Sequence, residues 1–330
     1  MNSESESDSR MPAPVIGVSD ADLDRAASII LAGGLVAMPT ETVYGLAADA
    51  TNGVAVARIY TAKGRPSFNP LICHVSGLTM AEEHAEFTPL ARRLAERFWP
   101  GPLTLVLPRK PASAIADLVT AGLPSIALRS PKHVAALGLI ARVGRPLAAP
   151  SANPSETLSP TTAQHVAHNL ASKIDLILDG GACAAGLEST IVAPGERGAV
   201  MLRPGALARA EIEQLTGPLT SPEAAAGVLA PGMTRRHYAP RARLRLDALD
   251  RRPGEAYLGF GAPPEGVSPS LNLSIRGDVE EAAANLFAML RTLDEQHDSI
   301  AVAPIPMEGV GEGIVDRLKR GAALARKDSV

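Results

Sequence analysis

The sequence predicts an α/β protein in which a twisted mixed sheet is covered by helices and is followed by a smaller Rossmann-like α/β unit. Helical and strand-like segments alternate along residues 19–216, but not as strict strand–helix–strand repeats, which favours a mixed sheet over a doubly wound one. The composition shifts to Pro, Ala, Gly and Thr over residues 217–240, as in a linker. A chain of 330 residues with 46% hydrophobic residues can bury the cores of two such domains.

Capping residues and glycines mark the helices of the first domain. Ser19 can cap the first helix, which Gly33 and Gly34 end, and Asn52 and Thr88 can cap the next two. The expected helices span residues 20–32, 53–63, 88–98, 131–143, 161–172 and 208–215. The expected strands are short apolar runs at residues 35–38, 71–75, 103–107, 125–128, 147–149, 175–178, 189–193 and 199–202.

The last part of the chain repeats this alternation on a smaller scale. The expected strands lie near Leu244 and at residues 256–260 and 300–303, and the expected helices at residues 279–296 and 313–326. A segment of this length and pattern is typical of a small Rossmann-like domain. The predicted organisation is a disordered acidic tail (residues 1–18), a main domain (19–216), a linker (217–240) and a C-terminal domain (241–330).

Composition argues against several classes of protein. The formal net charge of −3 disfavours wholesale binding of nucleic acid, and 3% aromatic residues disfavour a base-stacking platform. The longest apolar run, residues 29–38, is broken by two glycines and is too short to span a bilayer. The N-terminus does not resemble a signal or transit peptide, and Cys73 and Cys183 form no C-x-x-C motif. We therefore expect a cytoplasmic protein with reduced thiols.

The segment K-G-R-P-S-F-N-P-L-I-C-H-V, residues 63–75, is the most informative part of the chain. It places Lys63, Arg65 and Asn69 on a turn between an expected helix and an expected strand, with His74 on that strand. Prolines at positions 66 and 70 restrict the backbone of the turn. A stiff loop with a lysine and an arginine two residues apart suits a multiply charged anion, and the alternative is a solvated basic turn.

Two further loops favour the anion site. P-T-E-T-V-Y-G-L, residues 39–46, follows the expected strand 35–38, and A-A-P-S-A-N, residues 148–153, follows a short apolar approach. Ligands of open α/β sheets bind outside the carboxyl ends of strands. Three such loops, rich in Thr, Ser and Asn, therefore predict one shared pocket.

Other candidate sites have simpler explanations. Cys73 and His74 are neighbours on a strand and point to opposite faces, so they cannot form a nucleophile–base pair. The chain has no P-loop motif, and the glycines at 309, 311 and 313 lack dinucleotide-binding spacing. His165 and His168 indicate a surface helix, since no third metal ligand is in view. Arginines that end expected strands, at positions 129 and 203, bind either an anionic ligand or a carboxylate of the chain itself.

The ordered set of motifs resembles the L-threonylcarbamoyladenylate synthases, a family with a YrdC-like catalytic domain. The match rests on PTETVYGL, K-x-R with its N-P-L-I-x-H continuation, and S-x-N, followed by WPGPLTLVL, TAGLPSIALRSP, GLESTIV and MLRPGAL. PGMTRRHYAP and the α/β segment after it resemble the longer branch of this family, which adds a small C-terminal domain. The resemblance implies a YrdC-like twisted mixed sheet over residues 19–216, with residues 217–240 as linker and lid.

The same resemblance implies a reaction and its partners. Threonine and bicarbonate form a carbamate, which attacks the α-phosphorus of ATP, accompanied by Mg²⁺, and expels pyrophosphate. The product, L-threonylcarbamoyl-AMP, would pass to the transferase complex that modifies tRNA, and a weak direct contact with tRNA is left open. The rival interpretations are a non-enzymatic RNA-binding module with a YrdC-like fold and a carbamoyl-transfer or sugar-phosphate enzyme on a related fold.

The resemblance also implies site residues. The catalytic signature matches Lys63, Arg65, Ser151 and Asn153. The ATP-binding positions match Arg65, Asn69, Ser125, Ser151, Ser159, Arg203 and Tyr238. The threonine-binding positions match Thr40, His74, Arg129, Ala149 and Ser189. No carboxylate is assigned to a metal. Because Tyr238 lies in the linker, the linker is expected to fold over the site and exclude water from a labile mixed anhydride.

Overall fold

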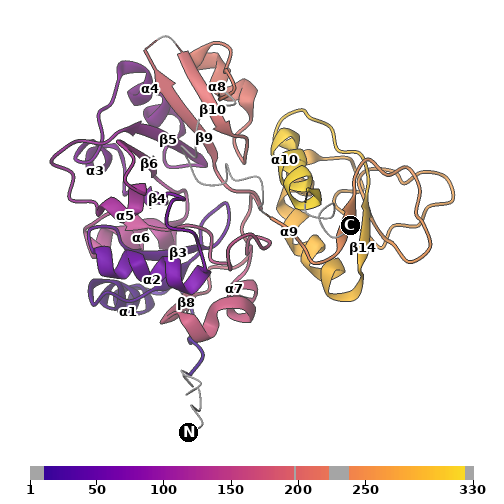
Figure 1. The fold of residues 1–330 in the computed structure, drawn as a ribbon, viewed down its shortest axis with the longest axis horizontal. Helices are drawn as coiled ribbons and strands as arrows, with labels where there is room; N and C mark the ends of the chain where they lie inside the picture. Colours follow the sequence, from indigo (N-terminus) through magenta and orange to yellow (C-terminus); the bar gives the residue numbers. More distant parts are fainter. Residues whose placement is uncertain (1–10, 197, 223–237, 324–330) are drawn as a thin grey trace, which may run out of the picture.

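The computed structural model describes residues 11–196, 198–222 and 238–323, which form two α/β domains (Figure 1). Most of the predicted tail and of the predicted linker lies outside the described residues, as do the last residues of the predicted final helix. Residues 219 and 220, which were assigned to the linker, lie beside the main sheet, where Thr220 exchanges backbone hydrogen bonds with Ala199 and Met201. Among the described helices, none is long and apolar enough to cross a bilayer.

The main domain contains a mixed sheet with helices on both faces. Its helices are α1 (Asp20–Leu31), α2 (Gly53–Lys63), α3 (Leu78–Glu82), α4 (Pro89–Phe98), α5 (Asp117–Thr120), α6 (Val134–Val143), α7 (Ala163–Leu170), the 3-10 turn η1 (Ala171–Lys173) and α8 (Arg209–Thr216). Its strands are β1 (Val15–Ile16), β2 (Val36–Met38), β3 (Gly45–Asp49), β4 (Ile72–His74), β5 (Leu103–Pro108), β6 (Ser125–Arg129), β7 (Leu147–Ala148), β8 (Leu176–Leu178), β9 (Thr190–Gly195) and β10 (Gly198–Arg203).

The strand order of this sheet is β1-β8-β2-β3-β7-β4-β6-β5-β9-β10. Parallel pairs such as β4 with β6 alternate with antiparallel pairs such as β4 with β7, so the predicted mixed sheet is confirmed. The parallel pairing of β4 and β6 places His74 beside Arg129, whereas β7 runs antiparallel to β4, so the chain that follows β7 passes the start of β4, where the Ala149 amide donates to the Ile72 carbonyl. Segments far apart in the sequence are therefore neighbours in the middle of the sheet.

Alternate residues of the strands face two different hydrophobic layers. On β2, Ala37 packs in the same cluster as the buried face of α2, whereas Val36 and Met38 pack with α1 and α6. Helices thus cover both faces of the sheet, and the strands are apolar on both sides. This arrangement keeps polar side chains out of the middle of the strands and leaves them at the strand ends.

The strand β3 was not predicted, because residues 39–46 read as one loop. Gly45 and Leu46 instead begin β3, which pairs antiparallel with β2 on one side and with β7 on the other. The segment G-L-A-A-D has few of the β-branched and aromatic residues that favour strands, so its pairing partners decide its conformation. The chain turns sharply at Thr40–Val43, and this turn becomes one wall of the site described below.

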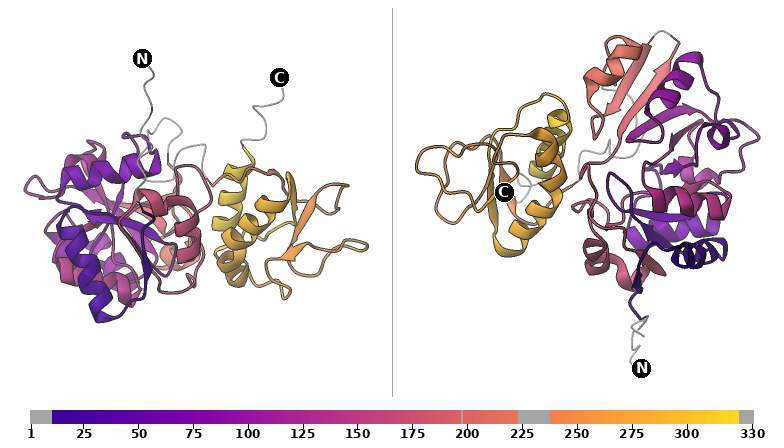
Figure 2. Two further views of the ribbon diagram at one scale, coloured as in Figure 1. Left: turned by 90° about the horizontal axis from the view of Figure 1, so that it is seen from below. Right: turned by 180° about the vertical axis from the view of Figure 1, so that it is seen from behind.

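The C-terminal domain has a parallel sheet of order β11-β14-β12-β13. Its elements are β11 (Arg243–Arg245), β12 (Ala256–Gly259), β13 (Leu271–Asn272), α9 (Val279–Gln296), β14 (Ser299–Val302) and α10 (Gly311–Ala322). Asp278 caps α9 by accepting from the amides of Glu280 and Glu281. The two helices lie on the face of this sheet that is turned towards the main domain (Figures 1 and 2).

The two domains share one hydrophobic cluster. Val43, Leu158 and Leu187 of the main domain pack in the same cluster as Leu286 and Phe287 of α9. The backbones also approach closely: Gly186 has a φ of +67°, and a Cβ added there would overlap the backbone of α9. Gly313 of α10 similarly faces the backbone of Gly205, so this glycine serves helix docking. The interface is therefore packed like the interior of a domain.

Candidate active site

A cavity lies where the strand ends of the main domain meet the C-terminal domain. Its walls leave a volume of about 40 Å³, which holds a few water molecules. The lining residues are Thr40, Thr42, Val43, Gly45, Arg65, Ile72, His74, Arg129, Ala149, Pro150, Ser151, Glu188, Ser189, Arg203 and Tyr238. Nine of the sequence-predicted site residues are among them, from all three predicted loops. The prediction of one shared pocket is therefore confirmed in its geometry.

The turn between β2 and β3 forms one wall through two threonines. The Thr40 hydroxyl donates to the Val43 carbonyl at 2.6 Å and accepts from the amides of Thr42 and Val43, each at 3.2 Å. The side chain of Thr40 thus closes the turn. The Thr42 hydroxyl accepts from Nη1 of Arg129 at 2.8 Å, so the same turn fixes a cavity arginine.

Arg129 ends β6, is 3% exposed and is held from several directions. In addition to Thr42, its Nε donates to the Gly101 carbonyl at 3.2 Å, and its Nη2 forms an ion pair with Glu41 at 2.7 Å. The sequence left two partners open for this arginine, an anionic ligand or a carboxylate of the chain, and the structure shows the carboxylate of Glu41. Sequence reasoning missed Glu41, which stands only one residue from Thr40. The hydrogen bonds to Thr42 and Gly101, together with the ion pair, hold the guanidinium at the cavity wall.

His74 ends β4 and faces the cavity, whereas its neighbour Cys73 is buried in the core on the other side of the sheet. Burial, with the nearby Arg129 guanidinium, lowers the pKa of His74 to about 3. Its Nδ1 atom is buried and has no hydrogen-bond partner among the described residues. His74 therefore presents a neutral ring with one uncommitted nitrogen at neutral pH. Burial raises the pKa of Cys73, which agrees with an unreactive thiol.

The buried His74 is expected to make the protein less stable as the pH falls. An unfolded histidine titrates near its ordinary pKa of 6.5, so between about pH 6.5 and 3 the unfolded chain binds more protons than the folded one. Stability should therefore fall from pH 7 to pH 5, before the carboxyl groups titrate. The melting temperature, measured across this pH range, should fall less steeply with decreasing pH for His74→Asn than for the wild type. Equal slopes in the two proteins would contradict the burial of a neutral ring.

Lys63 ends α2 but does not line the cavity. Its Nζ donates to the Ser151 carbonyl at 2.6 Å and, in a shorter contact, to the Asn153 carbonyl. Burial, and secondarily Arg65, lowers the pKa of Lys63 well below its ordinary value. The Lys63 side chain, which was predicted to suit a multiply charged anion, instead binds two backbone carbonyls in this structure. Lys63 holds the backbone of residues 151–153, and Ser151 itself lines the cavity.

Arg65 lines the cavity and is oriented by the same turn that contains it. Its Nε donates to the Asn69 carbonyl at 3.1 Å, and its Nη2 donates to the Asn69 side chain at 2.6 Å and the Pro70 carbonyl at 2.7 Å. No carboxylate forms an ion pair with Arg65 among the described residues. Burial is the main cause that lowers the pKa of Arg65 to about 10, so it keeps its charge at neutral pH. Asn69 thus acts as a support for Arg65 and does not line the cavity.

Ser189, Arg203 and Tyr238 form the opposite wall. Nη2 of Arg203 donates to the Ser189 carbonyl at 2.9 Å and to the Ser189 hydroxyl at 3.3 Å. Nη1 of Arg203 contacts the Tyr238 hydroxyl at 3.5 Å. The Ser189 hydroxyl is also 2.7 Å from that of Thr104. Tyr238 therefore lies at the site, as expected, although most of the predicted lid is outside the described residues.

Three other predicted residues lie away from the cavity wall. The Asn153 amide donates to the carbonyls of Pro154 and Thr157 and so closes its own loop. The Ser159 hydroxyl donates to Oε1 of Glu188. Ser125 begins β6, about 13 Å along the strand from the cavity end. The structure thus separates Ser125 from Arg129, because the two residues stand at opposite ends of one strand.

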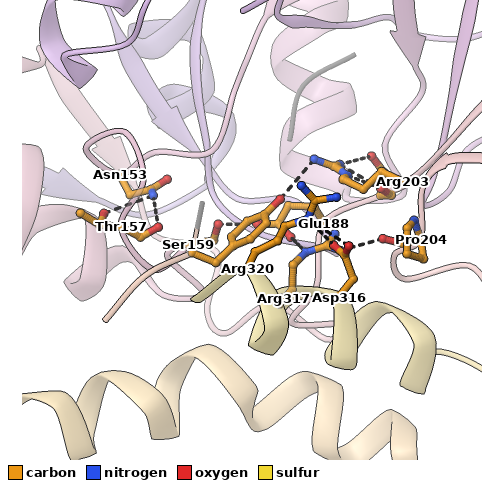
Figure 3. A network of polar contacts seen from close by, with 11 residues as sticks. Asn153, Thr157, Ser159, Glu188, Arg203, Pro204, Asp316, Arg317 and Arg320 are labelled. Carbon is orange, nitrogen blue, oxygen red and sulfur yellow. Dashed lines mark hydrogen bonds and ion pairs between the residues drawn. The ribbon is translucent and has the colours of Figure 1, made fainter. Parts of the chain in front are cut away.

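Two residues that the sequence did not assign to the site complete it. Glu188 lines the cavity, and its Oε2 accepts from Nε of Arg317 at 2.9 Å. Arg317 belongs to α10 of the C-terminal domain and is 1% exposed (Figure 3). The G-L-E-S-T motif is the local signal for Glu188, but its partner stands 129 positions later, where no local pattern marks it.

The described residues do not form a resident metal site. No group of three His, Cys, Asp or Glu side chains suited to a metal ion occurs in the described part of the chain. Both carboxylate oxygens of Glu188 already accept hydrogen bonds from Ser159 and Arg317. The polar groups that the chain itself brings to the cavity are arginines, hydroxyl groups, the neutral imidazole of His74 and Glu188.

Comparison with known proteins identifies the family. A family model described as telomere recombination matches residues 28–205, and one described as threonylcarbamoyl-AMP synthase, C-terminal domain, matches residues 207–323. The threonylcarbamoyl-AMP synthase of Bacillus subtilis is 40% identical over 328 residues, which cover 93% of this chain and 94% of that protein. The one of Pyrococcus abyssi is 42% identical over 317 residues, which cover 90% and 93%.

A solved structure agrees with these sequence matches. The crystal structure of P. abyssi Sua5 complexed with L-threonine matches with a TM-score of 0.86 and 38% identity, over 94% of this chain and 98% of that one. Both domains and their arrangement are therefore shared over nearly the whole length. On this identity and coverage, the chain belongs to the threonylcarbamoyl-AMP synthase family.

Proposed function

We propose that this protein joins L-threonine, bicarbonate and ATP to give L-threonylcarbamoyl-AMP and pyrophosphate. The observation on which this rests is a buried cavity that places Arg65 and Arg203 beside Thr40, His74 and Arg129. Arg65 and Arg203 suit a polyphosphate, whereas Thr40, His74 and Arg129 suit a small amino acid. The similarity to a Sua5 protein that was crystallised with L-threonine supports the same amino acid here.

The chemical steps need positioning and charge neutralisation more than covalent catalysis. The threonine amine attacks bicarbonate, and a C–N bond forms as water leaves, which gives a carbamate. A carbamate oxygen then attacks the α-phosphorus of ATP, an O–P bond forms, and the bond to pyrophosphate breaks. Charge on the transferring and leaving oxygens must be stabilised throughout. Arg65 and Arg203 are the groups that we assign to this role.

We assign the amino acid to the wall made by the β2–β3 turn and the ends of β4 and β6. Arg129 is fixed by Thr42 and Glu41, so it can offer its charge to the threonine carboxylate without reorganising. The neutral His74 ring has an uncommitted nitrogen for a hydrogen bond to the substrate. The proposed subsite thus combines a cation for the carboxylate with neutral polar groups for the amine and hydroxyl.

Magnesium is proposed to enter with the nucleotide. Mg²⁺ binds substrate phosphates and keeps several of its waters, and it requires few protein ligands. Its charge would add to that of the arginines at the phosphates. We further propose that the product passes to a tRNA-modifying transferase complex, and that the protein works in the cytoplasm. The free thiols of Cys73 and Cys183 support a reducing compartment.

The test is pyrophosphate release from the purified full-length chain with each of the twenty amino acids, with and without bicarbonate. Pyrophosphate release is expected to be fastest with threonine. It should also require bicarbonate, because the carbamate is the attacking group. Omission of ATP and heat-denatured protein are the controls. Salt-dependent tRNA binding with no ATP turnover would instead favour the non-enzymatic RNA-binding module.

A further inference from the structure

The C-terminal domain places one charged side chain, that of Arg317, against two residues of the cavity wall, Glu188 and Tyr238. Arg317 of α10 is 1% exposed, and burying an arginine is costly unless strong partners compensate. Figure 3 shows it between Glu188, Asp316 and Pro204. Its Nε forms an ion pair with Glu188 at 2.9 Å, and its Nη1 donates to Asp316 and to the Pro204 carbonyl, both at 2.8 Å. Glu188 and Pro204 both belong to the main domain.

Glu188 connects Arg317 with the cavity. Glu188 lines the cavity, and its carboxylate is held at one oxygen by Ser159 and at the other by Arg317. Burial acts to raise the pKa of Glu188, but the guanidinium groups of Arg317 and Arg203 outweigh it and keep the pKa below its ordinary value. The carboxylate is therefore charged and oriented, and it lies close to an arginine that we assign to the phosphates.

Two side chains of the C-terminal domain contact the ring of Tyr238. The ring of Phe287, on α9, stacks at a centroid distance of 5.9 Å and an interplanar angle of 28°. The guanidinium of Arg317 lies 4.9 Å from the centroid of Tyr238. The backbone of Tyr238 has a φ of +62°, a left-handed conformation that a tyrosine adopts only when its surroundings hold it. The position of this cavity residue is thus set by α9 and α10.

We propose that Arg317 is a positioning residue for nucleotide binding, which acts by holding Glu188 and Tyr238 in the cavity wall. This inference rests on the proposed function. It gives the C-terminal domain a specific role, because the main domain supplies the threonine end of the site and α10 completes the nucleotide end. Thr40, His74 and Arg129 have no contact with Arg317 among those described, so the two ends should respond differently to its loss.

The experiment measures dissociation constants for ATP and for threonine separately in the full-length chain. Arg317→Met keeps much of the side-chain volume and removes the charge. We expect ATP to bind at least tenfold more weakly and threonine to bind within twofold of the wild type. A merely structural role would lower the fraction of folded protein, and that would reduce the number of sites without changing either constant.

A matched control involves the same helix. Arg209 of α8 forms an ion pair with Glu312 of α10 at 2.6 Å, which also joins the two domains but lies away from the cavity. Arg209→Met should leave both dissociation constants unchanged. If the Arg209 and Arg317 variants bound ATP equally weakly, the proposal would be overturned, because a general loosening of the domain interface would then explain both results.

A double-mutant cycle tests whether Arg317 acts through Tyr238. In a Tyr238→Ala background, Arg317→Met should weaken ATP binding by much less than it does in the wild type. Fully additive effects of the two substitutions on the free energy of ATP binding would contradict the proposal. If Arg317→Met fails to fold, Glu188→Gln removes the ion pair from the other side and should weaken ATP, but not threonine. Unchanged ATP binding in that variant would overturn the inference alone, whereas a wild-type chain that binds no ATP would overturn the proposed function.

Discussion

Replacing Arg65 with methionine is expected to lower kcat/KM for ATP by about 100- to 1,000-fold, the usual loss for one preorganised charge donor. Arg65 lines the cavity and has no carboxylate partner among the described residues, so its charge is available to a ligand. Its geometry is fixed in advance by Asn69 and Pro70. The measurement is the rate of pyrophosphate release as ATP is varied at saturating threonine and bicarbonate.

The stability of the Arg65 variant should change much less than its activity. The substitution removes a buried charge whose partners are an amide oxygen and two backbone carbonyls, so gains and losses partly cancel. Arg58→Met is the control, since Arg58 lies on α2 outside the cavity and is paired with Asp175 at 3.0 Å. Normal kcat/KM for the Arg65 variant would refute its assignment to the phosphates.

Replacing Lys63 with methionine is expected to reduce kcat at least 100-fold through a displaced loop. The ammonium donates hydrogen bonds to the partly buried carbonyl of Ser151 and to the buried carbonyl of Asn153. Each carbonyl left without a partner costs about 1–3 kcal/mol, partly offset because a desolvated charge is also removed. Ser151 lies at the cavity wall, and misplacement of a catalytic wall by about 1 Å can cost about 100-fold in rate.

Stability measurements distinguish support of the loop by Lys63 from a direct contact of Lys63 with the phosphates. If Lys63 supports the loop, the variant should lose both activity and several degrees in melting temperature. Lys110→Met is the matched control, because Lys110 also donates to a backbone carbonyl, that of Glu82 at the end of α3, at 2.5 Å, away from the cavity. It should lose stability and keep its activity. Loss of activity at full stability in the Lys63 variant would indicate a direct contact with substrate.

Local patterns in the sequence correctly located the polar loops at the ends of buried strands. The alternation of apolar runs with capped helices predicted a mixed sheet with helices, and the end of a strand is where a polar side chain can leave the core. Three loops, which include Thr40, His74 and Ser151, were predicted to share one pocket on this basis, the family resemblance added Arg129, and the cavity contains all four residues. Strand β3 was missed, because its pairing with β2 and β7 outweighs its weak intrinsic preference for a strand.

By itself the sequence determined which chemical groups stand at the strand ends, and the ordered motifs indicated their family. Only the tertiary structure decided which group each of them contacts. It paired Arg129 with Glu41, turned Lys63 towards two carbonyls, and brought Arg317 to Glu188 across 129 positions of chain. The physical reason is that periodicity and capping depend on neighbours within a few residues, whereas a buried charge takes whichever partner the closed fold places within hydrogen-bond distance.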